Sequence, residues 1–326
     1  MKIAITGSIA YDYIMSYPGE FSEMLQAGGL EKISVSFLVD EMTRHPGGVA
    51  PNIAYTLALL GERPYLVGTA GRDFSDYRAF LEQAGVDTYG VELHEDLFTA
   101  SFFVSTDRLN NQIASFYTGA MARARDLTLQ RALQTPVDLV VISPNDPVAM
   151  SNYANECRES GYSFLYDPGQ QVARVNGEEL AEGLRGASVL IVNDVEHEAL
   201  CRKTGIIHQK LLDHVKTVIV TRGEHGADIY DRAGTYHIPV VPEQRIEDPT
   251  GVGDAFRAGL LKGLAAGWPW EISGRLGALA ATYVLEHRGT QAHNFTHHEF
   301  VERFRQHFDD GGLLDEMLES TNEKTA

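Results

Sequence analysis

Short, continuous apolar runs alternate with helix-like stretches through most of this 326-residue chain. The first run is "KIAITGS" at residues 2–8, and the helical pattern "APNIAYTLALLG" stands at 50–61. Buried parallel strands are short and rich in β-branched residues, and strands that alternate with helices build a sheet covered on both faces. We therefore predict an α/β fold with a central, mostly parallel sheet. Its further strands are expected at 64–71, 137–143, 162–168, 187–193 and 217–223.

Two stretches break this alternation. Residues 9–49 contain the strand-like run "KISVSFLVD" at 32–40 but no long helix before residue 50, and residues 99–118 read as two strands around the polar turn "DRLNN". Such strands would be antiparallel and would lie outside the main sheet. They predict a small β-sheet lid over the edge of the domain.

The chain is expected to form one domain at 1–310, with the lid strands drawn from about 9–49 and 96–120. Residues 254–307 read as mainly helical. The remaining residues, 311–326, are polar, and we expect them to form a frayed C-terminal tail.

Charge and composition narrow the class of protein. The formal net charge of −18 disfavours non-specific binding to nucleic acid or to an anionic membrane, although a local pocket can still accept an anionic substrate. No apolar stretch reaches the roughly 18 residues that a membrane span needs. Two cysteines in so long a chain favour a reducing compartment without disulfides. These features predict a cytoplasmic protein that binds neither nucleic acid nor membrane.

Polar residues and glycines follow most of the predicted strands. In an open α/β sheet, ligands bind at the carboxyl ends of the strands, so these residues are expected to converge there. The set comprises Ser8 and Asp12, "HPGGVAPN" with Gly48 and Asn52, Gln170 and Gln171, "NDVE" at 193–196, "TRG" at 221–223, and "DPTGVGDAF" at 248–256.

Each of these features also has a purely structural interpretation. Asn193 and Glu196 have the spacing of a helix capping box. Gly47 and Gly48 are typical of a turn before a helix, and Asp254 is typical of an acid in the first turn of a helix. The sequence contains no P-loop and no nucleophile elbow, and "GVGDAF" lacks the third glycine of a dinucleotide-binding motif.

The stretch "GVGD" at 251–254 fits phosphoryl transfer to an alcohol. Glycines allow the backbone to approach a phosphate closely, and the N-terminus of a helix stabilises an anion. Asp254 could take the proton of the attacking hydroxyl group. Glu196, with Asn193, could hold Mg²⁺ through water beside the phosphates of a nucleotide.

With these motifs assembled, the chain resembles the ribokinase-like (phosphofructokinase B) family of small-molecule kinases from its first strand to about residue 291. "PGGVAPN" looks like the family's substrate signature, "NDVE" like its magnesium and phosphate motif, and "TRGEHGA" like its nucleotide-side turn. The resemblance implies an anion hole at Gly251, Val252 and Gly253, with Asp254 as the base. Val252 stands where the family usually has a smaller residue. The resemblance implies ATP contacts at Asn193, Thr221, Arg222, Gly223 and Gly226.

Within the family, the likeness is greatest to bacterial adenosine kinases, and it implies ATP- and Mg²⁺-dependent conversion of adenosine to AMP in purine salvage. It also implies a homodimer formed through the lid strands. Asp12, Asn52 and the backbone of Gly48 would hold the ribose, while Ser8 and Ser36 would reach the base. Phe102 and Phe116 would sandwich the purine, and Gln170 and Gln171 would border it. Asp248 and Thr250 look like the family's ligands of a monovalent cation such as K⁺.

Other functions remain open at this stage. The acceptor could be another nucleoside or a sugar such as ribose or fructose 6-phosphate, because the base and the anion hole would serve all of them equally. A nucleoside-binding protein without catalytic activity is a third hypothesis. Phe102 and Phe116 could also be core residues of the lid rather than ligands of a base.

Overall fold

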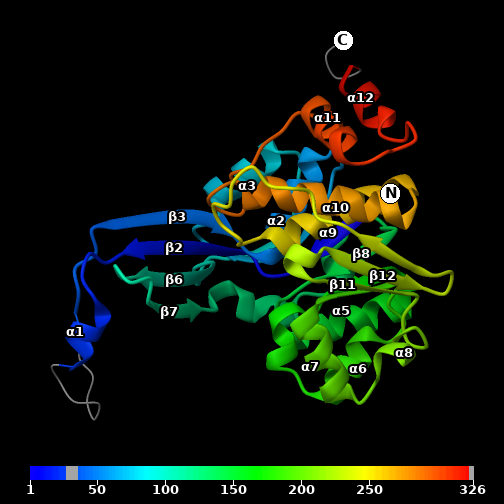
Figure 1. Ribbon diagram of the computed structural model, residues 1–326. Coiled ribbons are helices and arrows are strands. Elements are labelled where there is room, and N and C mark those ends of the chain that lie inside the picture. Colours follow the sequence, from blue (N-terminus) through cyan, green and yellow to red (C-terminus); the bar gives the residue numbers. More distant parts are fainter. Residues whose placement is uncertain (27–35, 323–326) are drawn as a thin grey trace.

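The computed structural model describes residues 1–26 and 36–322, and it has a large α/β body from which a small second sheet projects (Figure 1). The nine strands of the body have the order β13-β12-β11-β10-β9-β8-β1-β4-β5. All neighbours from β5 to β11 pair in parallel, and β12 and β13 add an antiparallel edge. The strands are β1 (Ile3–Thr6), β4 (Tyr65–Gly71), β5 (Asp87–His94), β8 (Leu139–Ile142), β9 (Ser163–Tyr166), β10 (Val189–Asn193), β11 (Thr217–Thr221), β12 (Ala227–Asp231) and β13 (Thr235–Ile238).

Helices cover both faces of this sheet, as the alternating sequence pattern predicts. One face carries α2 (Val49–Leu59), α3 (Ser75–Gln83), α9 (Val252–Ala266), α10 (Trp270–Leu285) and α11 (His297–His307). The other carries α4 (Leu129–Ala132), α5 (Pro147–Ser160), α6 (Gly177–Leu184), α7 (Asp194–Thr204) and α8 (His208–Leu211). The predicted fold class is confirmed.

Strand β8 shows why both faces can be covered. Its side chains alternate between two hydrophobic clusters: Leu139 and Val141 belong to the cluster under α2, α9 and α10, while Val140 and Ile142 belong to the cluster under α5 and α6. Successive side chains of a strand point to opposite faces, so a run of consecutive apolar residues gives two buried surfaces. In the part of the chain that the structure describes, no helix is both long and apolar enough to cross a bilayer.

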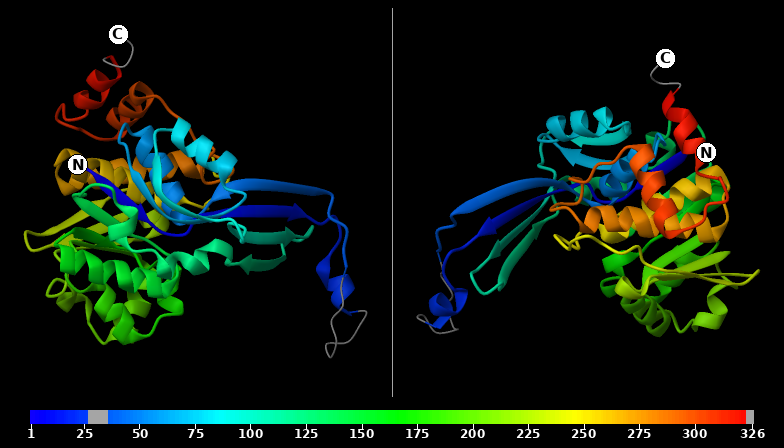
Figure 2. Two further views of the ribbon diagram at one scale, coloured as in Figure 1. Left: turned by 180° about the vertical axis from the view of Figure 1, so that it is seen from behind. Right: turned by 45° about the horizontal axis from the view of Figure 1, so that its top comes forward.

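The second sheet is the lid, and its strands have the order β3-β2-β6-β7. It extends away from the body in all three views, with α1 (Phe21–Gln26) at its far end (Figures 1 and 2). Strands β3 and β7 form its two edges. The four strands are β2 (Ala10–Ser16), β3 (Glu41–Gly47), β6 (Ala100–Thr106) and β7 (Gln112–Tyr117).

The prediction of a strand at 32–40 is wrong for the residues of this stretch that the structure describes. Residues 32–35 lie outside the described residues, and residues 36–40 form no strand. The strand is β3, which begins at Glu41 and pairs with β2 along its whole length. The sequence of β3, "EMTRHPG", is polar and contains a proline. It lacks the alternation of apolar residues by which a strand is recognised, so this edge strand could not be predicted.

Residues 311–322 are also not the frayed tail that was expected, whereas residues 323–326 lie outside the described residues. Helix α12 (Asp315–Asn322) follows a turn, and Leu314 and Met317 are fully buried against the main core. Arg305 of α11 forms ion pairs with Asp310 and Asp315 on this segment. Four apolar residues at helical spacing anchor the segment despite its polar composition: Leu313, Leu314, Met317 and Leu318.

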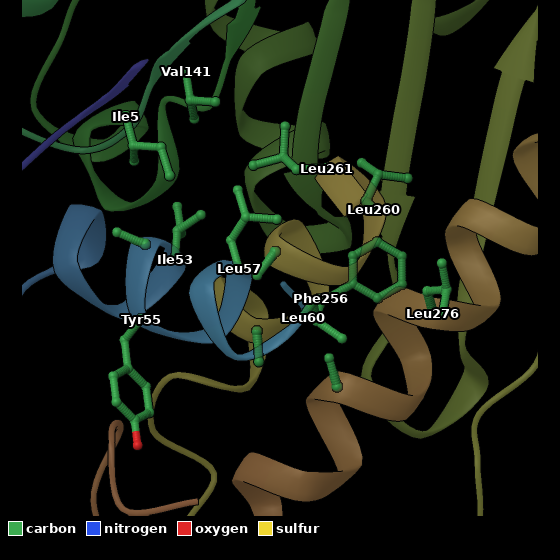
Figure 3. Packing of buried hydrophobic residues seen from close by; sticks show 14 of the residues in the cluster. Ile5, Ile53, Tyr55, Leu57, Leu60, Val141, Phe256, Leu260, Leu261 and Leu276 are labelled. Carbon is green, nitrogen blue, oxygen red and sulfur yellow. The ribbon is translucent and has the colours of Figure 1, made fainter. Parts of the chain in front are cut away.

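Helix α9 lies between α2 and α10, and Figure 3 shows Phe256 and Leu260 of α9 among the buried side chains of both neighbours. The contact with α10 is close because glycine stands at position 259. A Cβ atom there would lie 2.4 Å from the carbonyl oxygen of Leu276 and 2.5 Å from the backbone nitrogen of Gly277. The position of α9, which begins with the glycine-rich turn, therefore depends on this contact.

We expect Gly259→Ala to lower the free energy of unfolding by about 1–3 kcal/mol, because the added methyl group forces α9 and α10 apart. The loss should occur even though alanine favours an isolated helix by roughly 1 kcal/mol over glycine. Gly234→Ala is the matched control, since a Cβ at position 234 would meet no atom within 4 Å. Chemical denaturation measures both, and equal stability of the two variants would contradict the packing argument.

Candidate active site

The glycine-rich turn forms the N-terminus of α9. Gly251 is the N-cap residue with a φ angle of 80°, a left-handed conformation that glycine adopts without strain. A Cβ atom at this position would also lie 2.8 Å from Cγ2 of Thr290. Asp254 stands in the first turn of the helix. The first N–H groups of a helix have no partner within it, so the turn presents donors and the positive end of the helix dipole together with a carboxylate.

Two cavities meet at this turn. Gly251 and Asp254 line a cavity of about 410 Å³ beneath the lid, which we name the lid-side cavity. Val252 and Gly253 line a second cavity of about 630 Å³ beside α10, which we name the α10-side cavity. Both volumes are typical of small-molecule sites. One turn of backbone therefore separates two spaces that could each hold a ligand.

Nearly all residues predicted for the substrate line the lid-side cavity. They come from the end of β1, from α2, from the lid and from the segment after β9: Ser8, Asp12, Gly48, Asn52, Phe102, Phe116, Gln170 and Gln171. Ser36 is the exception. It is exposed and does not belong to the lining, because it lies in the lid beyond β2, next to Phe37, whose ring contacts Tyr17 and Phe21. The structure therefore does not bring Ser36 to the cavity.

Phe102 and Phe116 both line the cavity. They are directly opposite each other in the antiparallel pair β6–β7, so their side chains lie on the same face of the hairpin. The Cβ atoms of such a pair are about 5 Å apart, an arrangement that favours both rings on one side of a base over a sandwich around it. We name this pair the aromatic wall, and the sandwich stays a prediction.

The two glycines before α2 are required by close contacts. A Cβ atom on Gly47 would lie 2.6 Å from Oδ2 of Asp12, and one on Gly48, whose φ is 94°, would lie 2.5 Å from the carbonyl oxygen of Ser8. The glycine pair thus leaves room for Asp12 on β2. Burial and the nearby Asp248 raise the pKa of Asp12 to about 6.

Asp254 receives one side-chain hydrogen bond, from Nδ2 of Asn52 to its Oδ2 at 2.8 Å. The pKa of Asp254 is raised to about 7, mainly by burial and also by the nearby Asp167, while Arg257 and the bond from Asn52 oppose the shift. The carboxyl group therefore changes charge near neutral pH. A general base is most effective when its pKa lies near the working pH.

Sequence reasoning missed the ion pair below this turn. Arg257 is buried, and it contacts Asp167 at the end of β9 through Nε–Oδ2 at 2.5 Å and NH2–Oδ1 at 2.7 Å. Its NH1 group donates to the carbonyl oxygen of Gly253 at 2.8 Å. An arginine within the apolar stretch "AFRAGLL" was the available signal, since an arginine is almost never fully buried without a partner.

The α10-side cavity contains most of the predicted nucleotide contacts. Asn193, Thr221, Gly223 and Gly226 line it together with Val252 and Gly253. Arg222 is not part of the lining, because its side chain forms an ion pair with Asp228 at 2.8 Å. The rest of the wall combines apolar side chains, such as Val241 and Leu285, with the acids Asp194, Glu224 and Glu243.

The "NDVE" motif forms the capping box of α7. Asn193 Oδ1 accepts from the backbone N–H of Glu196 at 2.7 Å, and Glu196 Oε2 accepts from that of Asn193 at 2.9 Å. The structural interpretation is therefore correct. It does not exclude a second role, because Glu196 is close enough to Asp167 and Arg257 for both to influence its pKa, which burial raises. Asp194, which was not predicted, is the acid of this motif that lines the α10-side cavity.

Asp248 holds the neighbouring loops together. Its Oδ1 accepts from the backbone N–H of Thr250 at 2.9 Å, and its Oδ2 accepts from that of Gly289 at 3.2 Å. Thr250 lines the lid-side cavity. In the ranges 1–26 and 36–322, no group of three or more histidine, cysteine or acidic side chains is arranged to hold a metal ion. A cation bound by one of these carboxylates would need further oxygen ligands from backbone, water or a bound phosphate.

The geometry of one turn between two cavities agrees with the comparisons to known proteins. A family model described as pfkB family carbohydrate kinase matches residues 3–296. The chain belongs to the pfkB kinases. Its fold is accordingly the ribokinase-like fold, with a large, mostly parallel sheet and a small separate sheet.

Several relatives of this pfkB kinase are nucleoside kinases. A nucleoside kinase of Methanothermobacter thermautotrophicus is 30% identical over 307 residues, which cover 91% of this chain and 94% of the relative. The ligand-free structure of a Burkholderia thailandensis nucleoside kinase has a TM-score of 0.85 and 37% identity, over 93% of this chain and 99% of that one. The same enzyme in complex with inosine has a TM-score of 0.82, over 94% and 98% of the two chains.

The lining residues of the lid-side cavity that sequence reasoning missed include Met121, Arg174 and Thr290. Arg174 follows directly after a short 3₁₀ helix at Gly169–Ala173, and it is exposed. It is the only basic side chain among the described lining residues. None of these three stands in a recognisable motif, so only the fold could reveal them.

We expect Asp254→Asn to stabilise the protein, and more so at pH 8 than at pH 5. The folded pKa of Asp254 lies near 7, above its ordinary value of 3.8, so folding favours the protonated form. Wild-type stability is therefore lost as pH rises between these values, whereas asparagine has no charge to bury. Melting temperatures at both pH values measure the difference, and an advantage of the variant that does not grow with pH would contradict the raised pKa.

Proposed function

We propose that this pfkB kinase transfers the γ-phosphoryl group of ATP to the 5′-hydroxyl group of a purine nucleoside. One observation carries the proposal: the N-terminal turn of α9 is the shared wall of two cavities, with Asp254 on one side and Gly253 on the other. A nucleoside under the lid and ATP beside α10 would meet across this turn.

The residues at the turn would divide the reaction between them. Asp254 takes the proton of the 5′-hydroxyl group while that oxygen forms a bond to the γ-phosphorus and the bond from the γ-phosphorus to the β-phosphate oxygen breaks, which leaves ADP. The first N–H groups of α9 stabilise the charge on the transferred group. Gly253 lets the backbone approach that group, and Arg257 holds the carbonyl oxygen of Gly253 from behind.

The lid supports a nucleoside rather than a free sugar. Phe102 and Phe116 give the cavity an aromatic wall for a base, and Asp12, Asn52 and Asp254 line the same cavity with polar groups for a ribose. Stacking of a base on an aromatic ring contributes about 1–3 kcal/mol. A free pentose would leave that wall uncovered. The B. thailandensis complex with inosine supports the same choice.

Adenosine is the substrate that the sequence motifs favour, and inosine is a second candidate that the structure favours. Gln170 and Arg174 are both exposed at the cavity. An arginine only donates hydrogen bonds, and a 6-oxopurine offers two acceptors on one edge, O6 and N7, while adenine offers a donor and an acceptor there. The amide of Gln170 can serve either base.

The α10-side cavity would hold ATP, and a B. thailandensis structure in complex with ADP–inosine supports a nucleotide donor. Mg²⁺ would neutralise the nucleotide phosphates, and it commonly keeps most of its waters, so the single carboxylate of Glu196 could suffice to hold it. The backbone carbonyl groups around Asp248 and Thr250 would supply the site of a monovalent cation such as K⁺.

We propose that the enzyme works in the cytoplasm, where ATP is available. We also propose that it forms a homodimer through the lid. All residues of β7 are exposed, and β7 is an open edge of the lid sheet. Ile113, Phe116 and Tyr117 are apolar and each more than 40% exposed. Natural proteins usually cover such an edge. Light scattering on the purified protein distinguishes the dimer from a monomer.

A substrate panel tests the proposed function. We expect adenosine and inosine to be phosphorylated with a kcat/KM at least about tenfold above that of ribose, because ribose lacks the stacking contribution. Guanosine, cytidine and fructose 6-phosphate complete the panel, and Phe116→Ala is the matched variant. The variant should lose activity towards nucleosides and keep its low activity towards ribose. Equal turnover of ribose and nucleosides by the wild-type enzyme would contradict the proposal.

A further inference from the structure

Three side chains behind Asp254 form a continuous series of hydrogen bonds. Asn52 of α2 donates from Nδ2 to Asp254, and its Oδ1 accepts from Nε2 of Gln291 at 2.8 Å. The same Nε2 atom donates to the hydroxyl oxygen of Tyr77 at 2.5 Å. The Tyr77 hydroxyl group in turn donates to the carbonyl oxygen of Gly47 at 2.9 Å. Gln291 lies in the loop between α10 and α11, and it is only 7% exposed.

The carbonyl oxygen of Gly47 sets the direction of the whole series, because a carbonyl oxygen can only accept. Tyr77 has one hydroxyl proton, which it donates to Gly47, so its oxygen must accept from Gln291. The group of Gln291 that faces Tyr77 is therefore its NH₂ group, and the second hydrogen of that group points to Asn52. Asn52 must then present its oxygen to Gln291 and its own NH₂ group to Asp254.

This order matters because a side-chain amide can rotate by 180°, which exchanges the positions of its oxygen and its NH₂ group. The two groups are similar in size, so the rotated amide fits the same space. In the rotated state, the oxygen of Asn52 would face the carboxylate of Asp254, and two acceptors would meet. An ionised Asp254 disfavours this state, but a protonated Asp254 can donate to the Asn52 oxygen and so accommodate it. Within the described chain, Gln291 is the side chain that holds the other end of the Asn52 amide.

We propose that Gln291 is a positioning residue, which acts through Asn52 to keep a hydrogen-bond donor directed at the catalytic carboxylate of Asp254. The inference rests on the proposed function, because it assigns Asp254 the role of base. Gln291 itself contacts neither substrate nor cofactor. Its effect is to hold the carboxylate oxygen in place and to favour the ionised form that accepts a proton.

The other charged groups around Asp254 cannot replace this bond. Arg257, on the same helix, favours the ionised carboxylate, but it is already paired with Asp167 at the end of β9. Asp167 opposes ionisation of Asp254. Asn52 on α2 is the neutral donor that contacts the carboxylate directly. Loss of the correct Asn52 orientation should therefore raise the pKa of Asp254 and favour its protonated form.

The test is the pH dependence of kcat/KM for the best substrate of the panel, in wild type, Gln291→Met and Gln291→Glu. Methionine is similar in length and cannot donate, and an ionised glutamate repels the Asn52 oxygen and favours the rotated amide. The acid limb of wild type should lie near pH 7. We expect it to move upward by about one pH unit in both variants, since a hydrogen bond to a charged group has that magnitude. Activity should fall about tenfold at pH 6 and recover at pH 9.

A double variant separates positioning from folding. Asn52→Leu removes the amide, so Gln291→Met should cause no additional shift of the acid limb in that background, whereas the two effects of independent residues would add. A loss of activity that is the same at every pH, or a shift that persists without Asn52, would overturn the inference. Absence of nucleoside phosphorylation in the wild type would instead overturn the proposed function.

Discussion

The buried ion pair between Arg257 and Asp167 is the interaction on which the geometry of the site depends. Arg257 lies near the start of α9, Asp167 directly follows β9, and a second bond from Arg257 reaches the backbone of Gly253. These contacts join the glycine-rich turn to the carboxyl edge of the sheet. Burying two charges is costly, and such pairs often contribute little net stability. We therefore interpret this pair as a device that fixes the position of the turn rather than one that stabilises the fold.

The same pair sets the electrostatic balance at Asp254. Burial is the main cause that raises the pKa of that carboxyl group, and Asp167 adds to the shift, while Arg257 and Asn52 oppose it. The result is a group that ionises near pH 7, although the whole chain carries a net charge of −18. The first N–H groups of α9 and the guanidinium group of Arg257 are local donors of positive charge. They would offset the negative charge of the nearby carboxylates at the place where the phosphoryl group is transferred.

Much of the fold and part of the site could be predicted from the sequence, because the signals are local. Strands buried on both faces appear as continuous apolar runs, and the turn "GVGD" combines glycine, which permits a positive φ at Gly251, with an acid at the start of a helix. The expected positions of Asp12, Asn52 and Asp254 around one cavity followed from the rule that ligands meet at the carboxyl ends of parallel strands.

The remaining features depend on contacts between distant segments. Arg257 and Asp167 are 90 residues apart, and Asn52 and Gln291 are 239 residues apart, so no local pattern links them. Ser36 was misplaced because the position of a lid relative to the body is not encoded in strand periodicity. The direct pairing of Phe102 with Phe116 could not be predicted, because the register of a hairpin decides which of its residues face each other. Helix α12 was missed because a few apolar residues anchor a segment of polar composition.

The most direct measurement of the central claim is the rate of phosphoryl transfer by Asp254→Asn, compared with its affinity for the nucleoside. Asparagine keeps the shape of the side chain and can still accept the bond from Asn52, but it cannot take a proton. The account predicts that kcat falls by about 10²–10⁴-fold while the dissociation constant of the nucleoside changes little. A variant that retains kcat within about tenfold of wild type would show that Asp254 is not the general base.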